Sequence, residues 1–319
     1  MPRASVIIPN LNGLRFLETC LGALRRQTYR DFETIMVDDG STDDSVPWTN
    51  AHFPQVRIER LAKRSGMDVA CNRAAKIAQG DILVMLNNDT EAEPGWLAAL
   101  VAALDAHPRA GAAASKMLLY DRRDTLHTAG DMVGTDGVPR NRGVWEVDTG
   151  QYDQATEVFG GCGGGVAYRR EAWEAVGGFD QDLFMYLEDV DIAWRLQLAG
   201  WEAVFAPQAR LYHQLSATSG GSLGSYMTGR NTIWVIAKNY PGPLLRKHWR
   251  EVVAAQCKIS ADALRAWRGV EARQRLKGQL AGLLGLGKWL RKRRQVQANM
   301  RVSLAYIERL LVGPDGKLS

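Results

Sequence analysis

The alternation of short apolar runs with helical segments over the first 120 residues constrains the fold more than any other feature. Five runs have the length and the flanking turn residues of strands: residues 4–10, 33–40, 56–61, 81–89 and 110–119. Helical patterns lie between them, most clearly over residues 14–27, 67–80 and 93–107. Strands that alternate with helices predict an α/β fold with a mainly parallel sheet. In such sheets ligands bind at the carboxyl ends of the strands.

The rest of the chain divides into two parts of different character. Residues 121–165 are rich in Gly and Asp, and further elements are expected at 170–176, 201–205 and 209–213. Beyond about residue 222 the pattern is helical throughout. We therefore predict an α/β catalytic domain over residues 1–221 and a basic amphipathic helical region over residues 222–319.

The C-terminal region carries most of the positive charge. Residues 241–319 hold 17 Lys and Arg against 5 Asp and Glu, whereas residues 1–240 hold 23 against 30. Its helices interleave Arg with Trp and Leu, which is typical of helices that lie on an anionic membrane surface. A helical bundle that packs on the catalytic body or forms a homodimer explains the same pattern. No nucleic-acid-binding motif accompanies the charge, so nucleic acid is not expected as a partner.

The expected cellular setting follows from what the sequence lacks. Its cysteines are scattered without the C-x-x-C spacing of a zinc or redox site: Cys20, Cys71, Cys162 and Cys257. The first residues have the pattern of a strand rather than of a signal peptide, and no apolar run approaches the roughly 20 residues that span a bilayer. We expect a cytoplasmic protein that the C-terminal helices hold peripherally on the inner face of the cell membrane.

Residues 183–201 combine large apolar side chains with three carboxylates within four positions. If a helix begins near Leu187 and ends at Gly200, an apolar stripe follows one of its faces. Asp191 lies close to that stripe, four residues before Arg195. This spacing predicts a structural ion pair between the two side chains.

Glu188 and Asp189 fall in the first turn of the same helix. One explanation is that both carboxylates serve the helix N-terminus, whose dipole favours negative charge. The apolar run FMYL, which comes just before them, instead indicates a partly dry cleft. A carboxylate in a dry cleft has a raised pKa, which suits the role of a general base.

Polar residues follow two of the predicted strands. Asp38 and Asp39 open the turn VDDGSTDDS, and an Asp in this place can accept hydrogen bonds from a ribose or a base edge. The alternative is a simple turn in which Ser41 or Thr42 caps the next helix.

The second polar turn is LNNDT, in which Asn88 and Asp89 come directly after a buried strand. One carboxylate on such a loop suits a hard divalent cation that bridges phosphate oxygens, and the alternative is a polar turn that caps the next helix. His213 follows another short strand. A lone histidine is more often structural, and this one becomes a candidate ligand only if the fold brings it near Asp89.

Residues 160–165 contain five glycines, with Cys162 as the exception. So much glycine weakens a strand, and it predicts that something approaches the backbone closely. The spacing does not match G-x-G-x-x-G, because Val166 occupies the last position. A nicotinamide-binding site is therefore not expected.

Five motifs occur in order between Ser5 and about Asn231: VIIPNLNG, VDDGSTDDS, LNNDT, VGGFDQDLFMYLEDVDIAWRLQLAG and LYH. Together they resemble the glycosyltransferase family 2 enzymes, and most of all the rhamnosyltransferase-like branch that builds bacterial cell-surface polysaccharide. The resemblance implies a GT-A fold, inversion at the anomeric carbon, a nucleoside-diphosphate-sugar donor and Mg²⁺ or Mn²⁺. It implies transfer of a sugar, rhamnose among the candidates, to a hydroxyl of a glycan or lipid-linked acceptor.

The resemblance also implies roles for individual residues. It assigns Asp189 as the general base, with Glu188 in support, and it assigns Asp89 and His213 to the metal. The donor nucleotide is expected against five residues: Pro9, Asp38, Asp39, Arg64 and Asn88.

Two positions depart from the family pattern. Asn87 stands where the metal-binding D-x-D has its first Asp, so the ion is expected to keep more phosphate or water ligands. Arg64-Ser65-Gly66 replaces the usual Asn-x-Gly after the third strand, a change that bears on donor specificity.

Two other functions compete with sugar transfer. A nucleotidyltransferase that makes nucleotide sugars needs a Gly-, Arg- and Lys-rich loop near the N-terminus, which VIIPNLNGLR lacks. A non-catalytic protein that keeps the fold is favoured by Asn87 and opposed by the intact EDVD motif.

Overall fold

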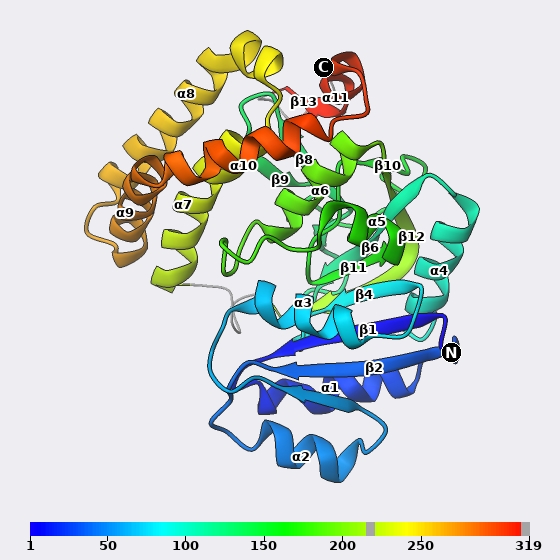
Figure 1. Cartoon of the computed structure of the whole chain (residues 1–319). Coiled ribbons are helices and arrows are strands. Elements are labelled where there is room, and N and C mark those ends of the chain that lie inside the picture. Colours follow the sequence, from blue (N-terminus) through cyan, green and yellow to red (C-terminus); the bar gives the residue numbers. More distant parts are fainter. Residues whose placement is uncertain (215–220, 314–319) are drawn as a thin grey trace.

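The structure is a computed structural model and describes residues 1–214 and 221–313. The described residues form one ten-stranded sheet and one three-stranded sheet (Figure 1). Eight strands of the large sheet follow the order β10-β12-β6-β11-β4-β1-β2-β3, while β5 pairs with β12 and β7 pairs with β6.

The N-terminal half of the large sheet is parallel, as the alternation predicts. β1 (Ala4–Asn10) pairs with both β2 (Phe32–Asp38) and β4 (Ile82–Leu86), and β3 (Arg57–Arg60) extends the sheet beyond β2. The helices of this half are α1 (Leu14–Arg25), α2 (Ser45–His52), α3 (Met67–Ile77) and α4 (Trp96–Ala106). The predicted α/β class is confirmed.

The other half of the sheet is mixed. β11 (Gly165–Arg169) runs antiparallel between β4 and β6 (Ala110–Leu119), and β12 (Glu202–His213) is parallel to β6. The smaller elements of this half are β5 (Thr90–Ala92), β7 (Leu126–Thr128), β10 (Glu157–Val158), α5 (Arg170–Val176) and α6 (Glu188–Ala199). Because β11 runs antiparallel to β4, the Gly-rich segment that precedes β11 lies at the carboxyl end of β4.

The two short strands predicted at 201–205 and 209–213 are one strand, β12. The register of β12 against β6 shifts between Ala206 and Arg210. Pro207 lies in this irregular stretch, where its missing N–H interrupts no regular ladder bond. The interruption visible in the sequence is therefore a bulge inside a strand rather than the end of one.

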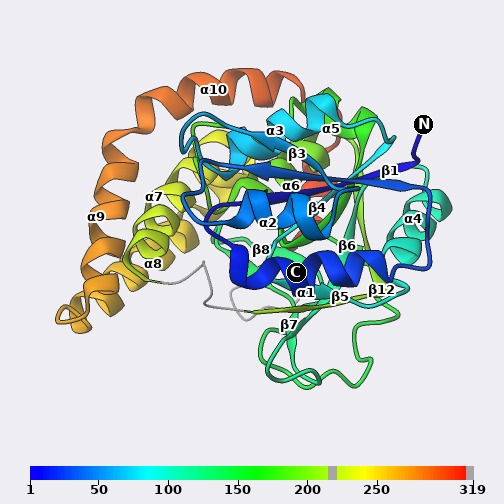
Figure 2. The ribbon, with the colours of Figure 1, turned by 90° about the horizontal axis from the view of Figure 1, so that it is seen from below.

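The large sheet separates two apolar cores. On β1, Val6 and Ile8 pack on the side of α1 and α4, whereas Ile7 packs on the side of α3, α5 and α6, as the two-residue period of a strand requires. Figure 1 shows α1 and α2 below the sheet and α3, α5 and α6 above it, and α1 and α2 come nearest the viewer in Figure 2. With both faces covered, the carboxyl edge is the part of the sheet that remains open to ligands.

Five helices follow the large sheet along the described chain: α7 (Gly221–Asn239), α8 (Gly242–Arg265), α9 (Val270–Leu284), α10 (Leu286–Ala298) and α11 (Leu304–Leu310). The prediction of helix throughout this region is wrong at β13 (Leu311–Val312), which pairs with β8 (Asp131–Gly134) beside β9 (Pro139–Asn141). A strand of two residues is too short to show a periodic pattern in the sequence.

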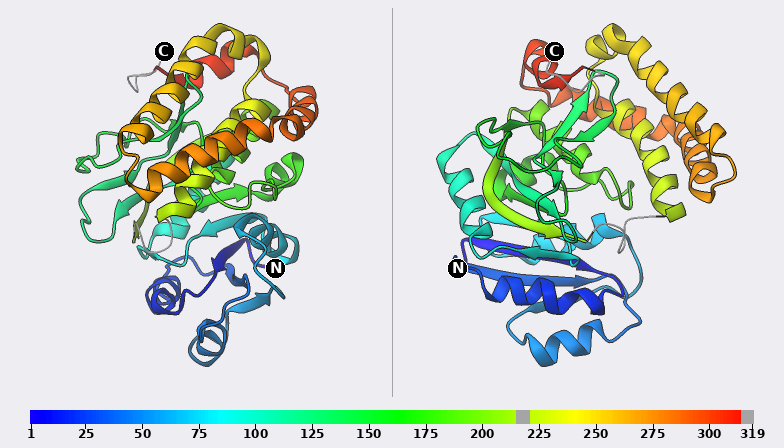
Figure 3. Two further views of the ribbon diagram at one scale, coloured as in Figure 1. Left: turned by 90° about the vertical axis from the view of Figure 1, so that its left-hand side faces the viewer. Right: turned by 180° about the vertical axis from the view of Figure 1, so that it is seen from behind.

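A third core joins α6 to the C-terminal helices. The predicted stripe, formed by Leu187, Val190, Trp194 and Leu198, packs against residues of α7 and α10 that include Val235, Ile236 and Trp289. The left panel of Figure 3 shows α8, α9 and α10 toward the viewer, on the outside of the molecule. The change in sequence character near residue 222 therefore does not coincide with a gap in the packing.

Asp191 forms a buried ion-pair network at this junction. Arg195 Nη2 lies 2.7 Å from its carboxylate, which confirms the ion pair predicted from the spacing. Lys238 of α7 contacts Asp191 at 2.8 Å and Asp180 at 2.7 Å. Although burial alone raises the pKa of Asp191, the charges of Arg195 and Lys238 hold it below its usual range. Asp191 is thus kept ionised and serves packing rather than proton transfer.

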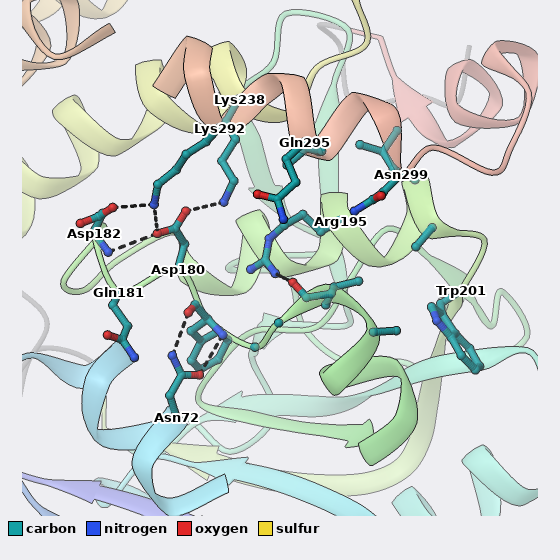
Figure 4. Close-up of a pocket in the computed structure, with 18 of the residues that line it drawn as sticks. Asn72, Asp180, Gln181, Asp182, Arg195, Trp201, Lys238, Lys292, Gln295 and Asn299 are labelled. Atoms are coloured by element: carbon teal, nitrogen blue, oxygen red, sulfur yellow. Dashed lines mark hydrogen bonds and ion pairs between the residues drawn. The ribbon is translucent and has the colours of Figure 1, made fainter. Parts of the chain in front are cut away.

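A cavity of about 580 Å³ lies beside this network, between the segment before α6 and helix α10. Figure 4 shows Lys238 and Lys292 pointing toward Asp180 across it. Its acidic side chains are neutralised by lysines, Asp180 by Lys238 and Lys292, and Asp182 by Lys288 and Lys292. We therefore infer that these ion pairs hold α10 in place and do not form a ligand-binding site.

Replacing Asp191 is predicted to destabilise the fold strongly. Asp191→Ala leaves Arg195 and Lys238 buried without their carboxylate, a change that costs about 3–5 kcal/mol of unfolding free energy. The matched control is Asp262→Ala, which removes the carboxylate of an exposed i,i+3 pair with Arg265 and costs less than about 1 kcal/mol. Urea unfolding followed by circular dichroism measures both. Equal losses for the two variants would contradict the network described above.

Candidate active site

A cavity of about 540 Å³ opens at the carboxyl ends of β1 and β4. Its walls come from the end of β1, residue 39 after β2, residues 64–70, the turn after β4, strands β7–β9, the Gly-rich loop, residues 184–190, the end of β12, and α7. In Figure 1 the strands β1 and β2 run leftward from the N-terminus, so their carboxyl ends lie on the same side as α7 and α9. The cavity is therefore bounded by the sheet edge and by the helical region.

A strained turn presents the acidic pair to this cavity. Phe184, Tyr186 and Leu187 all adopt left-handed backbone conformations, with φ of 73°, 67° and 65°. The left-handed region costs a residue with a side chain roughly 1–2 kcal/mol. Such strain persists where the surrounding structure holds it, and it is concentrated at functional sites. Helix α6 begins directly after this turn, with Glu188.

Glu188 and Asp189 both line the cavity, Glu188 as a buried side chain and Asp189 as a half-buried one. Burial raises the pKa of Glu188 well above its ordinary value, and the neighbouring charge of Asp189 raises it further. Burial also raises the pKa of Asp189, although backbone N–H groups that donate to its carboxylate oppose the effect. The dry surroundings expected from the FMYL run are therefore present.

The Gly-rich segment explains how the acidic pair fits against the sheet. The Gly163 N–H donates to Asp189 Oδ2 at 2.8 Å. A Cβ atom at position 163 would lie 3.3 Å from Glu188 Oε1, and one at Gly160 would lie 2.5 Å from the Cβ of Ala193. The first turns of α6 approach the backbone at Gly160 and Gly163, as the glycines predict, while Leu211 approaches Gly165.

Four of the five residues expected at the donor nucleotide line the cavity: Pro9, Asp39, Arg64 and Asn88. The Asp39 carboxylate accepts hydrogen bonds from the backbone N–H groups of Ser65 (2.6 Å) and Gly66 (3.0 Å), which joins β2 to the loop after β3. Arg64 lies over the ring of Phe184, with 5.7 Å between guanidinium and ring centre. The loop that carries Arg64 and the strained turn are thus in contact.

Asp38 is placed differently from Asp39. It is fully buried and accepts hydrogen bonds from Asn10 Nδ2 and from the Ser41 N–H. The alternative role predicted for Ser41 and Thr42 is wrong, because Asp44 precedes α2 as its N-cap. The Ser41 hydroxyl instead accepts from Asn10 and from the Asn12 N–H, so this turn fastens β2 to the loop after β1.

Asp89 and His213 come together although 124 positions separate them in the sequence. His213 Nε2 lies 3.1 Å from Asp89 Oδ1. His213 lines the cavity, whereas Asp89, only 1 % exposed, is not part of its lining and contacts His213 instead. The condition under which His213 becomes a candidate ligand is therefore met.

These two side chains fit a divalent cation as a partial ligand set. Neighbouring ligands of an octahedral Mg²⁺ at ~2.1 Å are about 3 Å apart, close to the separation of Asp89 Oδ1 and His213 Nε2. The described residues contain no group of three His, Cys, Asp or Glu side chains that could hold a metal alone. An ion here needs further ligands from a diphosphate or from water, as the Asn87 substitution predicts.

Sequence reasoning missed two titratable residues of the cavity, His127 and Asp131. His127 Nδ1 lies 3.3 Å from His213 Nδ1, and burial, reinforced by the charge of His213, lowers the pKa of His127 to about 3. Burial and then the charge of Asp189 raise the pKa of Asp131 to about 8. Both residues lie in the segment 121–165, where strands of three or four residues leave no periodic signal.

The family model described as "Glycosyl transferase family 2" matches residues 5–177. The chain belongs to glycosyl transferase family 2. Membership predicted from the five motifs is therefore confirmed. The order of strands and the C-terminal helices agree with the GT-A fold expected of a family 2 member.

Named relatives of this family 2 chain come from several bacteria. The N-acetylglucosaminyl-diphospho-decaprenol L-rhamnosyltransferase of Mycobacterium tuberculosis is 28% identical over 251 residues, which cover 71% of this chain and 81% of the relative. The O-antigen biosynthesis protein RfbC of Myxococcus xanthus is 33% identical over 68% of this chain. The chain spans only 18% of RfbC, and only 25% of the protein y4gI of Sinorhizobium fredii, to which it is 30% identical.

Solved structures share the fold at low identity. The mannosyltransferase PcManGT from Pyrobaculum calidifontis, in complex with GDP-Man and Mn²⁺, matches 94% of this chain and 86% of its own, with a TM-score of 0.57 and 20% identity. GalNAc-T7 with UDP, GalNAc and Mn²⁺ matches 75% of this chain and 48% of its own, with a TM-score of 0.60 and 18% identity.

Removing either member of the Asp89–His213 pair is predicted to weaken nucleotide binding only when the metal is present. Asp89→Ala and His213→Ala should each lower the affinity for a nucleoside diphosphate in the presence of Mn²⁺ by about tenfold or more. Loss of a residue that only supports a metal ligand already lowers metal affinity by ~10–100-fold, and loss of a ligand itself should cost at least as much. Isothermal titration with and without Mn²⁺ measures this. His248→Ala is the control, since His248 lies on α8 and contacts Glu251 and Glu308. Unchanged Mn²⁺-dependent binding in both site variants would count against the pair.

Proposed function

We propose that the protein transfers a sugar from a nucleoside-diphosphate donor to a hydroxyl group, with inversion at the anomeric carbon. One observation carries the proposal: the Asp189 carboxylate opens into the same cavity as Asp39 and as His213, whose Nε2 contacts Asp89. The side chains that we propose for the base, the nucleotide and the metal thus meet at one cavity, which Asp89 reaches through His213. Membership of glycosyl transferase family 2 supports the same reaction class.

The donor lies, in this proposal, along the carboxyl ends of β1, β2 and β4. Pro9 and Arg64 bound the nucleoside, with Asp39 holding the loop that carries Arg64. Asn88 is held by its hydrogen bond to Asn10 Oδ1 at 2.8 Å and faces the diphosphate. We propose rhamnose as the first sugar to test, because a mycobacterial relative bears the name of an L-rhamnosyltransferase.

We propose Asp89 and His213 as the protein ligands of a divalent cation, Mg²⁺ or Mn²⁺. When bound, such an ion neutralises charge that develops on the departing nucleoside diphosphate. His127 helps to orient His213, because its neutral ring contacts His213 Nδ1, on the opposite side of the His213 ring from Asp89. Two structures of the same fold contain Mn²⁺, which supports the proposal.

Asp189 accepts the proton of the acceptor hydroxyl. A bond forms between that oxygen and the anomeric carbon while the bond from the anomeric carbon to the diphosphate oxygen breaks, and the hydroxyl proton passes to the Asp189 carboxylate. The raised pKa of this group makes it a stronger base than an exposed Asp. The Gly163 N–H keeps one of its oxygens fixed while lone pairs remain for the proton.

The acceptor is proposed to be a glycan or a lipid-linked sugar, which places the protein at a membrane surface. No helix in residues 1–214 or 221–313 is long and apolar enough to cross a bilayer. Instead, α8 and the turn after it expose Trp249 (53 %) and Trp267 (54 %), and α9 exposes Leu284 (80 %). Trp249 on α8 and Trp267 in the turn after it each precede an exposed cation, Arg250 and Arg268. Neighbouring apolar and cationic groups favour an anionic lipid surface.

Asp189→Asn is predicted to lower turnover by at least ~10² while nucleotide binding and the unfolding free energy stay near native values. In the native protein, activity should be lost as pH falls through the raised pKa of Asp189, so the acid limb lies above the pH of about 4 expected of an ordinary Asp.

Initial rates of nucleoside-diphosphate release over a pH series test both statements. Asp31→Asn is the control, because Asp31 is exposed at the amino end of β2. Near-native turnover of Asp189→Asn would remove the base assignment. Release of pyrophosphate in place of a nucleoside diphosphate would favour a nucleotidyltransferase.

The proposed lipid contact is tested by sedimentation with vesicles. The full chain should bind phosphatidylglycerol vesicles more tightly than phosphatidylcholine vesicles, and added salt should weaken the binding. The variant Trp249→Ser/Trp267→Ser should bind about tenfold or more less tightly. Trp145→Ser is the matched control, because Trp145 is 60 % exposed but lies in the loop before β10. Vesicle binding by the double variant at the native level would reject the lipid surface. The same holds if the double variant loses dimers but keeps its vesicle binding.

A further inference from the structure

The strained turn before α6 is held from one side by two neighbouring residues of α7, Asn231 and Arg230. Asn231 is fully buried, and its Nδ2 donates to the backbone carbonyls of Leu183 (3.3 Å), Met185 (2.9 Å) and Tyr186 (2.8 Å). An amide NH₂ carries two hydrogens, so it is fully engaged by this turn. The contact spans 45 to 48 positions of sequence and joins the helical region directly to the segment before the acidic pair.

Arg230 fixes the orientation of that amide. Its Nε donates to Asn231 Oδ1 at 2.9 Å, which directs the Asn231 nitrogen toward the turn. A second guanidinium nitrogen of Arg230 donates to the Leu183 carbonyl at 2.8 Å. The carbonyl groups of the turn are thus bound by two neighbouring side chains of α7.

The turn needs such a support because its own residues oppose its conformation. Phe184, Tyr186 and Leu187 have positive φ, and none of them is glycine. The Leu187 carbonyl accepts the Asp191 N–H and so opens the first turn of α6. If Leu187 returned to an extended conformation, the direction of the following residues, Glu188 and Asp189, would change with it.

The same turn also touches the nucleotide edge of the cavity. A Cβ atom at Gly66 would lie 2.5 Å from the ring of Phe184, so the ring rests on the bare backbone of residue 66. The Gly66 N–H in turn donates to Asp39. One conformation of the turn therefore sets the base and bounds the donor loop.

We infer that Asn231 is a positioning residue, which holds residues 183–187 in the left-handed conformation that directs Asp189 into the cavity. The inference rests on the proposed function, in which Asp189 is the base, and it makes α7 a working part of the catalytic site. A purely structural role for Asn231 would add stability without affecting the chemistry of Asp189.

The first experiment compares Asn231→Ala with Thr232→Ala. Thr232 is buried on the same helix, and its hydroxyl donates to the Thr228 carbonyl within α7, away from the turn. Asn231→Ala is expected to lower kcat at least tenfold, with a smaller change in KM for the donor. Its acid limb should move to lower pH, because a loosened turn admits water to Asp189 and lowers the pKa of that carboxylate toward its ordinary value. Thr232→Ala should show neither effect.

The second experiment tests the backbone directly. Glycine adopts positive φ without steric cost, so Leu187→Gly removes part of the strain that Asn231 is inferred to hold. The double variant Asn231→Ala/Leu187→Gly is expected to have a higher kcat than Asn231→Ala. Urea unfolding of each variant shows whether lost kcat merely follows lost stability. A double variant no faster than Asn231→Ala, together with an unshifted acid limb, overturns the inference.

The outcomes separate this inference from the proposed function. If Asp189→Asn abolishes turnover while Asn231→Ala matches Thr232→Ala, the base assignment stands and the positioning role is rejected. If Asp189→Asn retains turnover, the proposed function itself is rejected. Amide hydrogen exchange gives a readout that needs no substrate. Residues 183–189 should exchange faster in Asn231→Ala than in Thr232→Ala, and equal exchange contradicts the inference that Asn231 holds the turn.

Discussion

The placement of two adjacent carboxylates, the buried Glu188 and the half-buried Asp189, against one cavity is the constraint on which the rest of the site depends. Neighbouring acids without cations near them are unfavourable in a dry environment, and their raised pKa values express that cost. Three features hold the pair in place despite this cost: the strained turn before the pair, the Gly-rich backbone that contacts Asp189, and α7, which binds the turn. The same features that make the pair costly make Asp189 suitable as a base.

Asp191 shows the contrast two residues along the same helix. It is as deeply buried as Glu188, yet Arg195, Lys238 and Asn239 neutralise and hydrogen-bond it, so its pKa falls while that of Glu188 rises. One acid of the EDVD segment therefore anchors α6 to the helical region, and within residues 1–214 and 221–313 no ion pair neutralises the two acids before it. Packing and chemistry are divided between neighbouring residues of a single turn.

The sequence was sufficient for the features that have a period or a local spacing. Strands β1–β4 and β6, helix α6, the Asp191–Arg195 pair and the close backbone at residues 160–165 follow from patterns within about ten residues. His127 and Asp131 were missed because they reach the site through very short strands whose pairing is decided by distant partners. Asn231 was missed as a contributor for a similar reason: its partners are main-chain carbonyls, which leave no trace in side-chain patterns.

The most direct measurement is a crystal structure of the protein with a non-transferable nucleoside-diphosphate sugar and Mn²⁺. The account predicts the nucleoside against residues 9, 39 and 64, the ion between the diphosphate and residues 89 and 213, and the carboxylate of residue 189 on the face of the sugar opposite the diphosphate. A donor bound elsewhere, or a carboxylate of residue 189 that faces the diphosphate side of the anomeric carbon, would contradict it.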